Sequence, residues 1–197
     1  MDSAFIIIEL DNKANIDEKE LAYRCSHGDP EALTELYNRY ATKLYSLCSR
    51  YVSNPSEGND LMHDTMLKAF ERIKQYRYVG KGSLYAWLSR VAVNLAIDRL
   101  RKGIRMEMVD IKETFPDPDG FDPSEACNSI PIDELQLMIQ SLPDSKRVVF
   151  NMYCIEGYSH KEIAQRLGIS EKASSSVLSK AKRMLSKMIN DYYNRNA

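Results

Sequence analysis

Long apolar runs are missing from this sequence of 197 residues. A membrane-spanning helix needs roughly 18 or more consecutive apolar residues, and no segment approaches that length. The apolar run at residues 5–8 is too short for the core of a signal peptide, and no basic segment precedes it. We therefore expect a protein that stays in the cytoplasm and is not inserted in a membrane.

Cysteine is sparse, and its spacing does not match the common metal-binding motifs. The four cysteines are Cys25, Cys48, Cys127 and Cys154. None forms a C-x-x-C pair, and the three histidines show no metal-ligand spacing with them. We expect reduced, mostly buried thiols, no metal and no cofactor. A phosphate-binding loop and a nucleophile elbow are also missing, so we expect a protein that is not an enzyme.

The formal net charge of −1 conceals three charged blocks whose sign alternates along the sequence. Residues 72–105 contain nine basic residues and one acidic residue, and residues 158–197 contain eight basic and three acidic residues. Between them, residues 106–134 contain nine acidic residues and one basic residue. Two basic blocks separated by an acidic one predict two surfaces that face a polyanion. Charge alone leaves DNA, RNA and lipid open.

The apolar pattern is helical nearly throughout. Apolar residues recur three and four positions apart in residues 20–52, 61–73 and 84–100, and again from residue 132 onward. Asp29 and Ser83 are expected to cap helices, and Pro30 suits a first helical position. Prolines and acidic residues without an apolar period fill residues 106–131. We predict an all-α fold with an N-terminal extension (1–16), a helical domain (17–105), a flexible acidic linker (106–131) and a helix-turn-helix domain (132–197).

A helix-turn-helix is the strongest local motif. Ser159 and Glu162 form a predicted capping box, Gly168 suits the left-handed end of a short helix, and Ser170 caps a second helix over about residues 171–189. The candidate DNA-binding residues are Ser159, His160, Lys161, Ser170, Lys172, Ser174, Ser175, Ser176, Ser179, Lys180, Lys182 and Arg183. The alternative is a solvated helix that only packs on its neighbours.

Aromatic and basic residues alternate in the first basic block. Stacking faces beside a positive groove are typical of single-stranded nucleic-acid binding. Tyr76 and Tyr78 flank a turn and are the better stacking candidates, whereas Trp87 lies among Leu84 and Leu88 and is as readily explained as core.

The order of these motifs resembles the extracytoplasmic-function group of bacterial sigma factors over about residues 17–189. The resemblance includes Gly28-Asp29-Pro30-Glu31-Ala32, residues 60–70 (DLMHDTMLKAF), residues 83–94 (SLYAWLSRVAVN), and residues 156–159 (EGYS) before the helix-turn-helix. The helix-turn-helix alone is shared with many regulators, so a stand-alone regulator is the alternative. The ordered pair of domains is specific to sigma factors.

The resemblance implies a transcription initiation factor that binds core RNA polymerase and promoter DNA. It implies polymerase contacts at Asp60, His63, Asp64 and Lys68. It implies recognition and opening of the −10 element by Tyr76, Arg77, Tyr78, Lys81, Ser83, Tyr85, Arg90, Asn94, Asp98, Arg101 and Lys102. The helix-turn-helix would read the −35 element. Arg99 lies among the −10 candidates in the sequence but is the candidate for a structural ion pair rather than for a DNA contact. Many members of the family are held by an anti-sigma factor, so such a partner is a further candidate.

This chain departs from the family pattern at three positions. His63 stands where the family usually has Gln. In the second helix of the helix-turn-helix, Ser175 and Val177 stand where the family commonly has Lys and Arg. The −35 sequence is therefore not predicted.

Overall fold

The computed structural model describes residues 16–109 and 130–196, with backbone only for residues 102–109 and 196. Every regular element in these two ranges is helical. The predicted extension falls mainly in residues 1–15, and most of the predicted linker falls in residues 110–129, so both lie largely outside the described residues.

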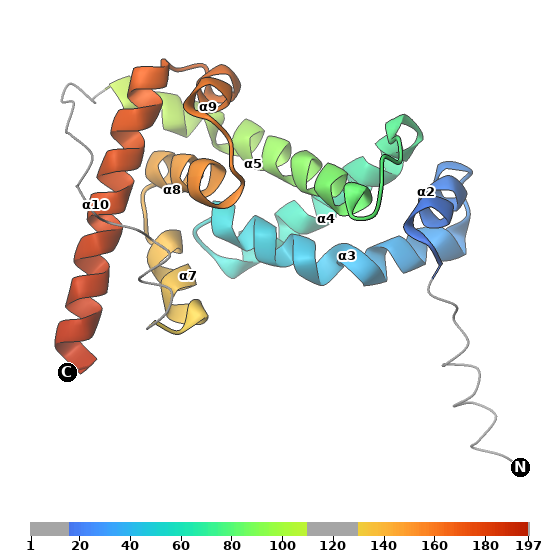
Figure 1. The fold of residues 1–197 in the computed structure, drawn as a ribbon, viewed down its shortest axis with the longest axis horizontal. Helices are drawn as coiled ribbons and strands as arrows, with labels where there is room; N and C mark the ends of the chain where they lie inside the picture. Colours follow the sequence, from blue (N-terminus) through green and yellow to red (C-terminus); the bar gives the residue numbers. More distant parts are fainter. Residues whose placement is uncertain (1–15, 110–129, 197) are drawn as a thin grey trace, which may run out of the picture.

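Helices α2 to α5 form what we call the N-terminal bundle, residues 16–109. The helices are α2 (Glu18–Ser26), α3 (Pro30–Tyr51), α4 (Pro55–Arg72) and α5 (Ser83–Val109), with a 3-10 turn, η1 (Ile73–Gln75), after α4. α3, α4 and α5 pack against one another, and α2 closes the end of the bundle where α3 begins (Figure 1). Helix α5 continues to Val109, four residues into the segment expected to be linker.

Local sequence explains where α3 and α4 begin. The Asp29 carboxylate accepts hydrogen bonds from the amides of Glu31 and Ala32, as predicted. Arg24 pairs with the same carboxylate at 2.6 Å, and its hydrogen bond is the main cause that lowers the pKa of Asp29. Asn54 caps α4 in the same way, through the amide of Glu57. Both helices carry proline in the first turn, where a missing N–H costs nothing.

Helices α7 to α10 form the C-terminal bundle, residues 130–196. They are α7 (Ile132–Gln140), α8 (Asp144–Phe150), a π-helical turn η2 (Asn151–Ile155), α9 (His160–Leu167) and α10 (Glu171–Asn196). α10 packs on α7, α8 and α9, and in Figure 1 it crosses one side of the molecule. Leu178, Ala181 and Leu185 recur at spacings of three and four residues along α10 and are buried.

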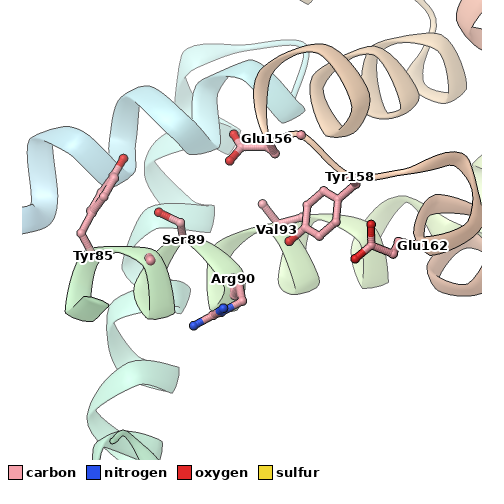
Figure 2. A pocket seen from close by; sticks show the side chains of 9 residues that line it. Tyr85, Ser89, Arg90, Val93, Glu156, Tyr158 and Glu162 are labelled. Atoms are coloured by element: carbon pink, nitrogen blue, oxygen red, sulfur yellow. The ribbon is translucent and has the colours of Figure 1, made fainter. Parts of the chain in front are cut away.

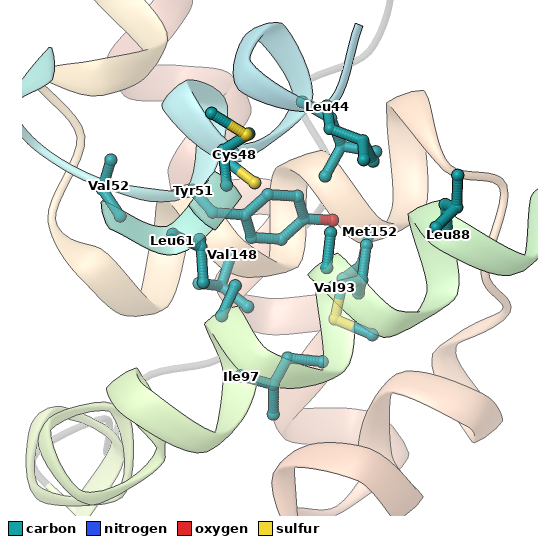
Figure 3. Packing of buried hydrophobic residues seen from close by; sticks show 14 of the residues in the cluster. Leu44, Cys48, Tyr51, Val52, Leu61, Leu88, Val93, Ile97, Val148 and Met152 are labelled. Carbon is teal, nitrogen blue, oxygen red and sulfur yellow. The ribbon is translucent and has the colours of Figure 1, made fainter. Parts of the chain in front are cut away.

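The two bundles share one apolar core. α8 packs on α3 and α5, and α9 packs on α5 (Figure 1). Figure 3 shows Tyr51, Val93 and Ile97 of the N-terminal bundle beside Val148 and Met152 of the C-terminal bundle. The sequence predicted two domains but not this direct packing of one on the other.

Candidate nucleic-acid interface

The helix-turn-helix has the predicted local geometry. The Ser159 amide donates to Glu162 Oε2 at 2.8 Å, and the Glu162 amide donates to Ser159 Oγ at 3.3 Å, which completes the capping box. The hydrogen bond from the Ser159 amide is the main cause that lowers the pKa of Glu162. Gly168 ends α9 with φ of 69°, where a side chain would be strained. Ser170 Oγ accepts from the Ala173 amide at 3.0 Å and begins α10.

Three serines expected to face DNA are buried, and this expectation was wrong. Ser174, Ser176 and Ser179 are 0%, 6% and 3% exposed. Because α8 and α9 both pack against α10, small side chains there let the helices approach closely. Val177 is also fully buried, so this departure from the family pattern lies in the core. Ser175 is the exposed serine within this stretch of α10.

The other candidates of the helix-turn-helix lie at or near the surface. Ser159, Lys161, Ser170, Lys172 and Arg183 are exposed, and Lys180 and Lys182 are partly exposed. His160 is partly buried: its Nδ1 lies 2.9 Å from Ser174 Oγ, and its ring stacks on that of Tyr153. His160 therefore joins the start of α9 to the start of α10.

The loop between η1 and α5 separates its two tyrosines into different environments. The Tyr76 hydroxyl and Ser83 Oγ lie 2.6 Å apart, and the Tyr76 ring lies 5.6 Å from the half-buried Trp87 ring. Burial is the main cause that raises the pKa of Tyr76. Tyr78 is exposed, as are Arg77 and Lys81. Tyr78 is the better placed of the two for stacking on a base.

Sequence reasoning missed Glu18, which supplies the cap expected from Ser83. Glu18 Oε2 accepts from the Gly82 amide and Oε1 from the Leu84 amide, each at 2.7 Å. The Ser83 hydroxyl instead lies 2.6 Å from the Gly80 carbonyl oxygen. An acidic residue at the start of α2 satisfies orphan amides at the start of α5. No local pattern signals a cap from 64 residues away in the sequence.

Helix α5 carries the remaining candidates of the first basic block. Arg90, Asn94, Asp98 and Arg101 are exposed, and the Lys102 side chain lies outside the described residues. Tyr85 is partly buried and stacks on Tyr40.

A pocket of about 450 Å³ separates this face of α5 from the C-terminal bundle. Tyr85, Ser89 and Arg90 line it from α5, and Glu156, Tyr158 and Glu162 line it from the other side (Figure 2). The Arg166 guanidinium donates to Asn94 Oδ1 at 2.6 Å. Two carboxylates therefore lie beside residues expected to face DNA.

The exposed side of α4 carries the candidates for polymerase contact. Asp60, His63 and Asp64 are exposed, and Lys68 pairs with Glu71 at 2.9 Å. Asp64 forms an ion pair with Arg99, which confirms the structural interpretation of Arg99. His63 Nε2 lies 3.2 Å from the Tyr37 hydroxyl.

Leu67 is a further exposed residue on α4 that the sequence reading missed, with 62% of its surface accessible. Leu67 follows His63 and Asp64 by four and three residues, so it shares their exposed side of α4.

The described residues hold no cluster of acidic, histidine or cysteine side chains suited to a metal ion. None of their helices combines the length and apolar character needed to span a bilayer. Cys25 and Cys48 are buried, and burial raises the pKa of each thiol to about 11. Cys154 is exposed, so two of the three described cysteines are buried, in agreement with the expectation of mostly buried thiols.

Two families match the chain in order. The Sigma-70 region 2 family matches residues 36–105, and the Sigma-70 region 4 family matches residues 132–185. The ECF RNA polymerase sigma factor SigW of Bacillus subtilis is 28% identical over 83% of this chain and 92% of its own length. The ECF RNA polymerase sigma-E factor of Haemophilus influenzae is 26% identical over 88% of this chain and 96% of its own. The solved structure of CnrH in complex with the cytosolic domain of CnrY matches 87% of this chain and 96% of that chain, with 22% identity and a TM-score of 0.46.

Proposed function

The chain belongs to the extracytoplasmic-function group of bacterial RNA polymerase sigma factors, and from that premise we propose which of its residues act at each step. It is a transcription initiation factor and not an enzyme. It binds core RNA polymerase and directs it to promoters through a region 2 domain for the −10 element and a region 4 domain for the −35 element. The observation that carries this conclusion is the ordered pair of family matches on the two bundles.

Opening of the −10 element is assigned to the loop before α5 and to α5 itself. Tyr78 would stack on an unpaired base, and one such contact contributes ~1–3 kcal/mol. That energy offsets the few kcal/mol needed to unstack and unpair a base, so opening needs no ATP. Arg77, Lys81, Arg90 and Arg101 would contact phosphates, and Asn94 and Asp98 would face the bases. Tyr76 and Ser83 support this loop from within, since their hydroxyls bond to each other.

Recognition of the −35 element is assigned to the exposed residues of α9 and α10. Ser175 would lie against base edges in the major groove. Lys161, Lys172 and Arg183 would contact phosphates, and Ser170 would contact phosphate at the N-terminus of α10. Ser174, Ser176 and Ser179 have no part in this, because they are buried.

Core polymerase would dock on α4. Asp60, His63 and Asp64 supply polar contacts on its exposed side, and the exposed Leu67 supplies an apolar one. A polar rim around an apolar anchor is the usual anatomy of a protein interface.

We also propose a cytoplasmic location and a domain boundary within residues 110–129. An anti-sigma partner stays a prediction from the family resemblance.

Transcription reconstituted from purified core polymerase and this protein tests the proposal. We expect initiation at a defined upstream sequence only when the protein is present. A variant with Asp60→Ala, Asp64→Ala and Leu67→Ala should lose co-purification with core polymerase, whereas Glu57→Ala on the same helix should not. A stand-alone regulator would bind DNA without binding core, and that result would reject the sigma-factor mechanism.

A further inference from the structure

An apolar pocket lies at the surface of the N-terminal bundle, between α3 and α4. It has a volume of about 250 Å³ and is lined by Leu33, Thr34, Tyr37 and Phe70. The three apolar side chains among them are partly buried and pack against the core. An apolar cavity of ~150 Å³ holds one benzene ring, so this pocket has room for one aromatic side chain and part of a second apolar one.

The apolar surface continues from the pocket along α4. Leu67 precedes Phe70 by three residues and is 62% exposed, and His63 lies one turn before Leu67. The His63 and Tyr37 rings stack with their centroids 6.3 Å apart, so α3 and α4 form one continuous strip here. We call the pocket together with His63 and Leu67 the α3–α4 groove. Apolar grooves with polar rims are typical binding sites.

The chain itself contains a segment of matching chemistry. Residues 4–8 read Ala-Phe-Ile-Ile-Ile, and no longer unbroken apolar run occurs in the 197 residues. An aromatic ring next to branched aliphatic side chains matches the size and the apolar lining of the groove. No step of the proposed function uses this run, so it is available as an occupant.

Residue 16 is held close enough to the groove for residues 4–8 to reach it. The Ile16 carbonyl oxygen accepts a hydrogen bond from Arg39 Nη1 at 2.9 Å, which fixes this point beside α3. Leu33 lies about 9 Å from Arg39 along α3, and half the circumference of the helix adds a sideways step, so the path is about 20 Å. The eight residues from Ile8 to Ile16 span up to ~26 Å at ~3.3 Å each, which exceeds this path.

Charge favours the same placement. Residues 1–15 contain three acidic residues and one lysine, which gives a side-chain charge of −2. The exposed cations Arg72 and Lys74 follow Phe70 at the end of α4 and in η1. Asp2 and Glu9 flank the apolar run, so a run bound in the groove brings carboxylates toward these cations.

We propose that the α3–α4 groove is a binding site for residues 4–8 of the same chain, and that the bound segment competes with core polymerase for α4. The proposal rests on the proposed function, because His63 and Leu67 belong both to the groove and to the assigned polymerase surface. A tethered segment competes at a high effective concentration and needs no strong affinity of its own. It lowers the apparent affinity for polymerase by the fraction of chains in which the groove is free.

Photo-cross-linking of the full chain tests the occupancy of the groove. Phe5 is replaced by p-benzoylphenylalanine, which keeps an aromatic ring at that position, and the product is mapped by mass spectrometry. We expect an intramolecular product on residues 30–37 or 67–74. Absence of a product, a product on another surface, or a product that joins two chains would overturn the proposal.

A charge placed in the pocket gives a second readout of occupancy. Thr34→Glu puts a carboxylate beside Leu33 and Phe70, and Thr34 is exposed, so the fold is kept. We expect the yield of the cross-link to fall about tenfold, because an unpaired charge in an apolar site is costly. Thr42→Glu makes the same change about two turns further along α3, at another exposed position, and should leave the yield unchanged. Equal yields in the two variants would contradict binding in the pocket.

Affinity for core polymerase tests the competition. Phe5→Ser with Ile7→Ser removes two apolar side chains of the run. We expect this variant to bind core polymerase about tenfold more tightly than the wild type, as when the groove is free in roughly one tenth of wild-type chains. Ser3→Ala with Asn12→Ala is the matched control in the same segment.

The outcomes separate this proposal from the proposed function. Equal affinity of the Phe5→Ser, Ile7→Ser variant and the wild type, or an equal gain in the control, would overturn the competition for α4. If neither the variant nor the wild type bound core polymerase, the proposed function would be rejected, and the cross-link would still decide the occupancy of the groove.

Discussion

Glu18→Ala should impair promoter opening by loosening the loop that carries Tyr78. The Glu18 carboxylate accepts from the Gly82 and Leu84 amides at 2.7 Å with separate oxygens. Loss of a helix cap costs ~0.5–2 kcal/mol, so two amides left without this acceptor cost about 2 kcal/mol. That corresponds to a factor of about 30 in the population of the ordered loop. Glu18→Gln keeps one carbonyl oxygen, so about 1 kcal/mol and a factor of roughly five are expected.

The measurement separates promoter opening from the steps before it. The fluorescence of 2-aminopurine placed in the −10 element reports unstacking, and a mobility shift at low temperature reports the closed complex. We expect promoter opening to be strongest in the wild type, weaker in Glu18→Gln and weakest in Glu18→Ala. The formation of closed complexes and the binding to core polymerase should be unchanged. Glu20→Ala, on the exposed side of the same helix, is the control. The reasoning is refuted if Glu18→Ala opens promoters as wild type does, or if closed-complex formation falls by the same factor as opening.

Three further predictions concern separate parts of the molecule. Tyr78→Ala should weaken promoter opening by ~1–3 kcal/mol and leave the free energy of unfolding unchanged. Tyr76→Ala should lower the free energy of unfolding by about 1–2 kcal/mol, because a hydrogen bond and a ring contact are lost. If the two variants had equal effects in an opening assay and in urea unfolding, this division of roles would be contradicted. Lys172→Ala should lower the slope of log affinity against log salt by about 0.9 in DNA titrations, and an unchanged slope would exclude a phosphate contact there. The folded state lowers the pKa of Glu162, so its contribution to stability is present above the ordinary value of 4.5 and is lost as pH falls through the folded pKa. Glu162→Gln should therefore flatten the decline of stability below pH 4.5 in urea unfolding, and a decline as steep as that of wild type would show that Glu162 is not its source.

Most of the helical architecture was predictable, because its signals are local. The caps at Asp29 and Ser159, the left-handed Gly168 and the spacing of apolar residues each act within a few positions of the chain. The position of the helix-turn-helix followed from them. The limits of α5 and α10 did not, since both helices continue past the expected ends. Gly103 does not end α5, which continues to Val109, and α10 is held mainly by its packing on α8 and α9.

The face that each serine of α10 presents could not be predicted from its polarity. Ser174, Ser176 and Ser179 are small enough to be buried between helices, and which side is buried depends on where α8 and α9 lie. The same holds for Tyr76 and Tyr78, which are two residues apart and differ in exposure: the Tyr76 hydroxyl bonds to Ser83 and its ring lies against Trp87, whereas Tyr78 is exposed.

The sequence by itself determined the class of protein and the order of its parts: helices, a helix-turn-helix, and two basic blocks separated by an acidic one. These follow from periodicity, capping and charge, which depend on near neighbours in the chain. The tertiary structure alone decided that Glu18 caps α5, that Arg166 bonds to Asn94, and that the C-terminal bundle closes the end of α3. Each of these contacts joins residues more than 60 positions apart, where only the packing of helices on one another brings donor and acceptor together.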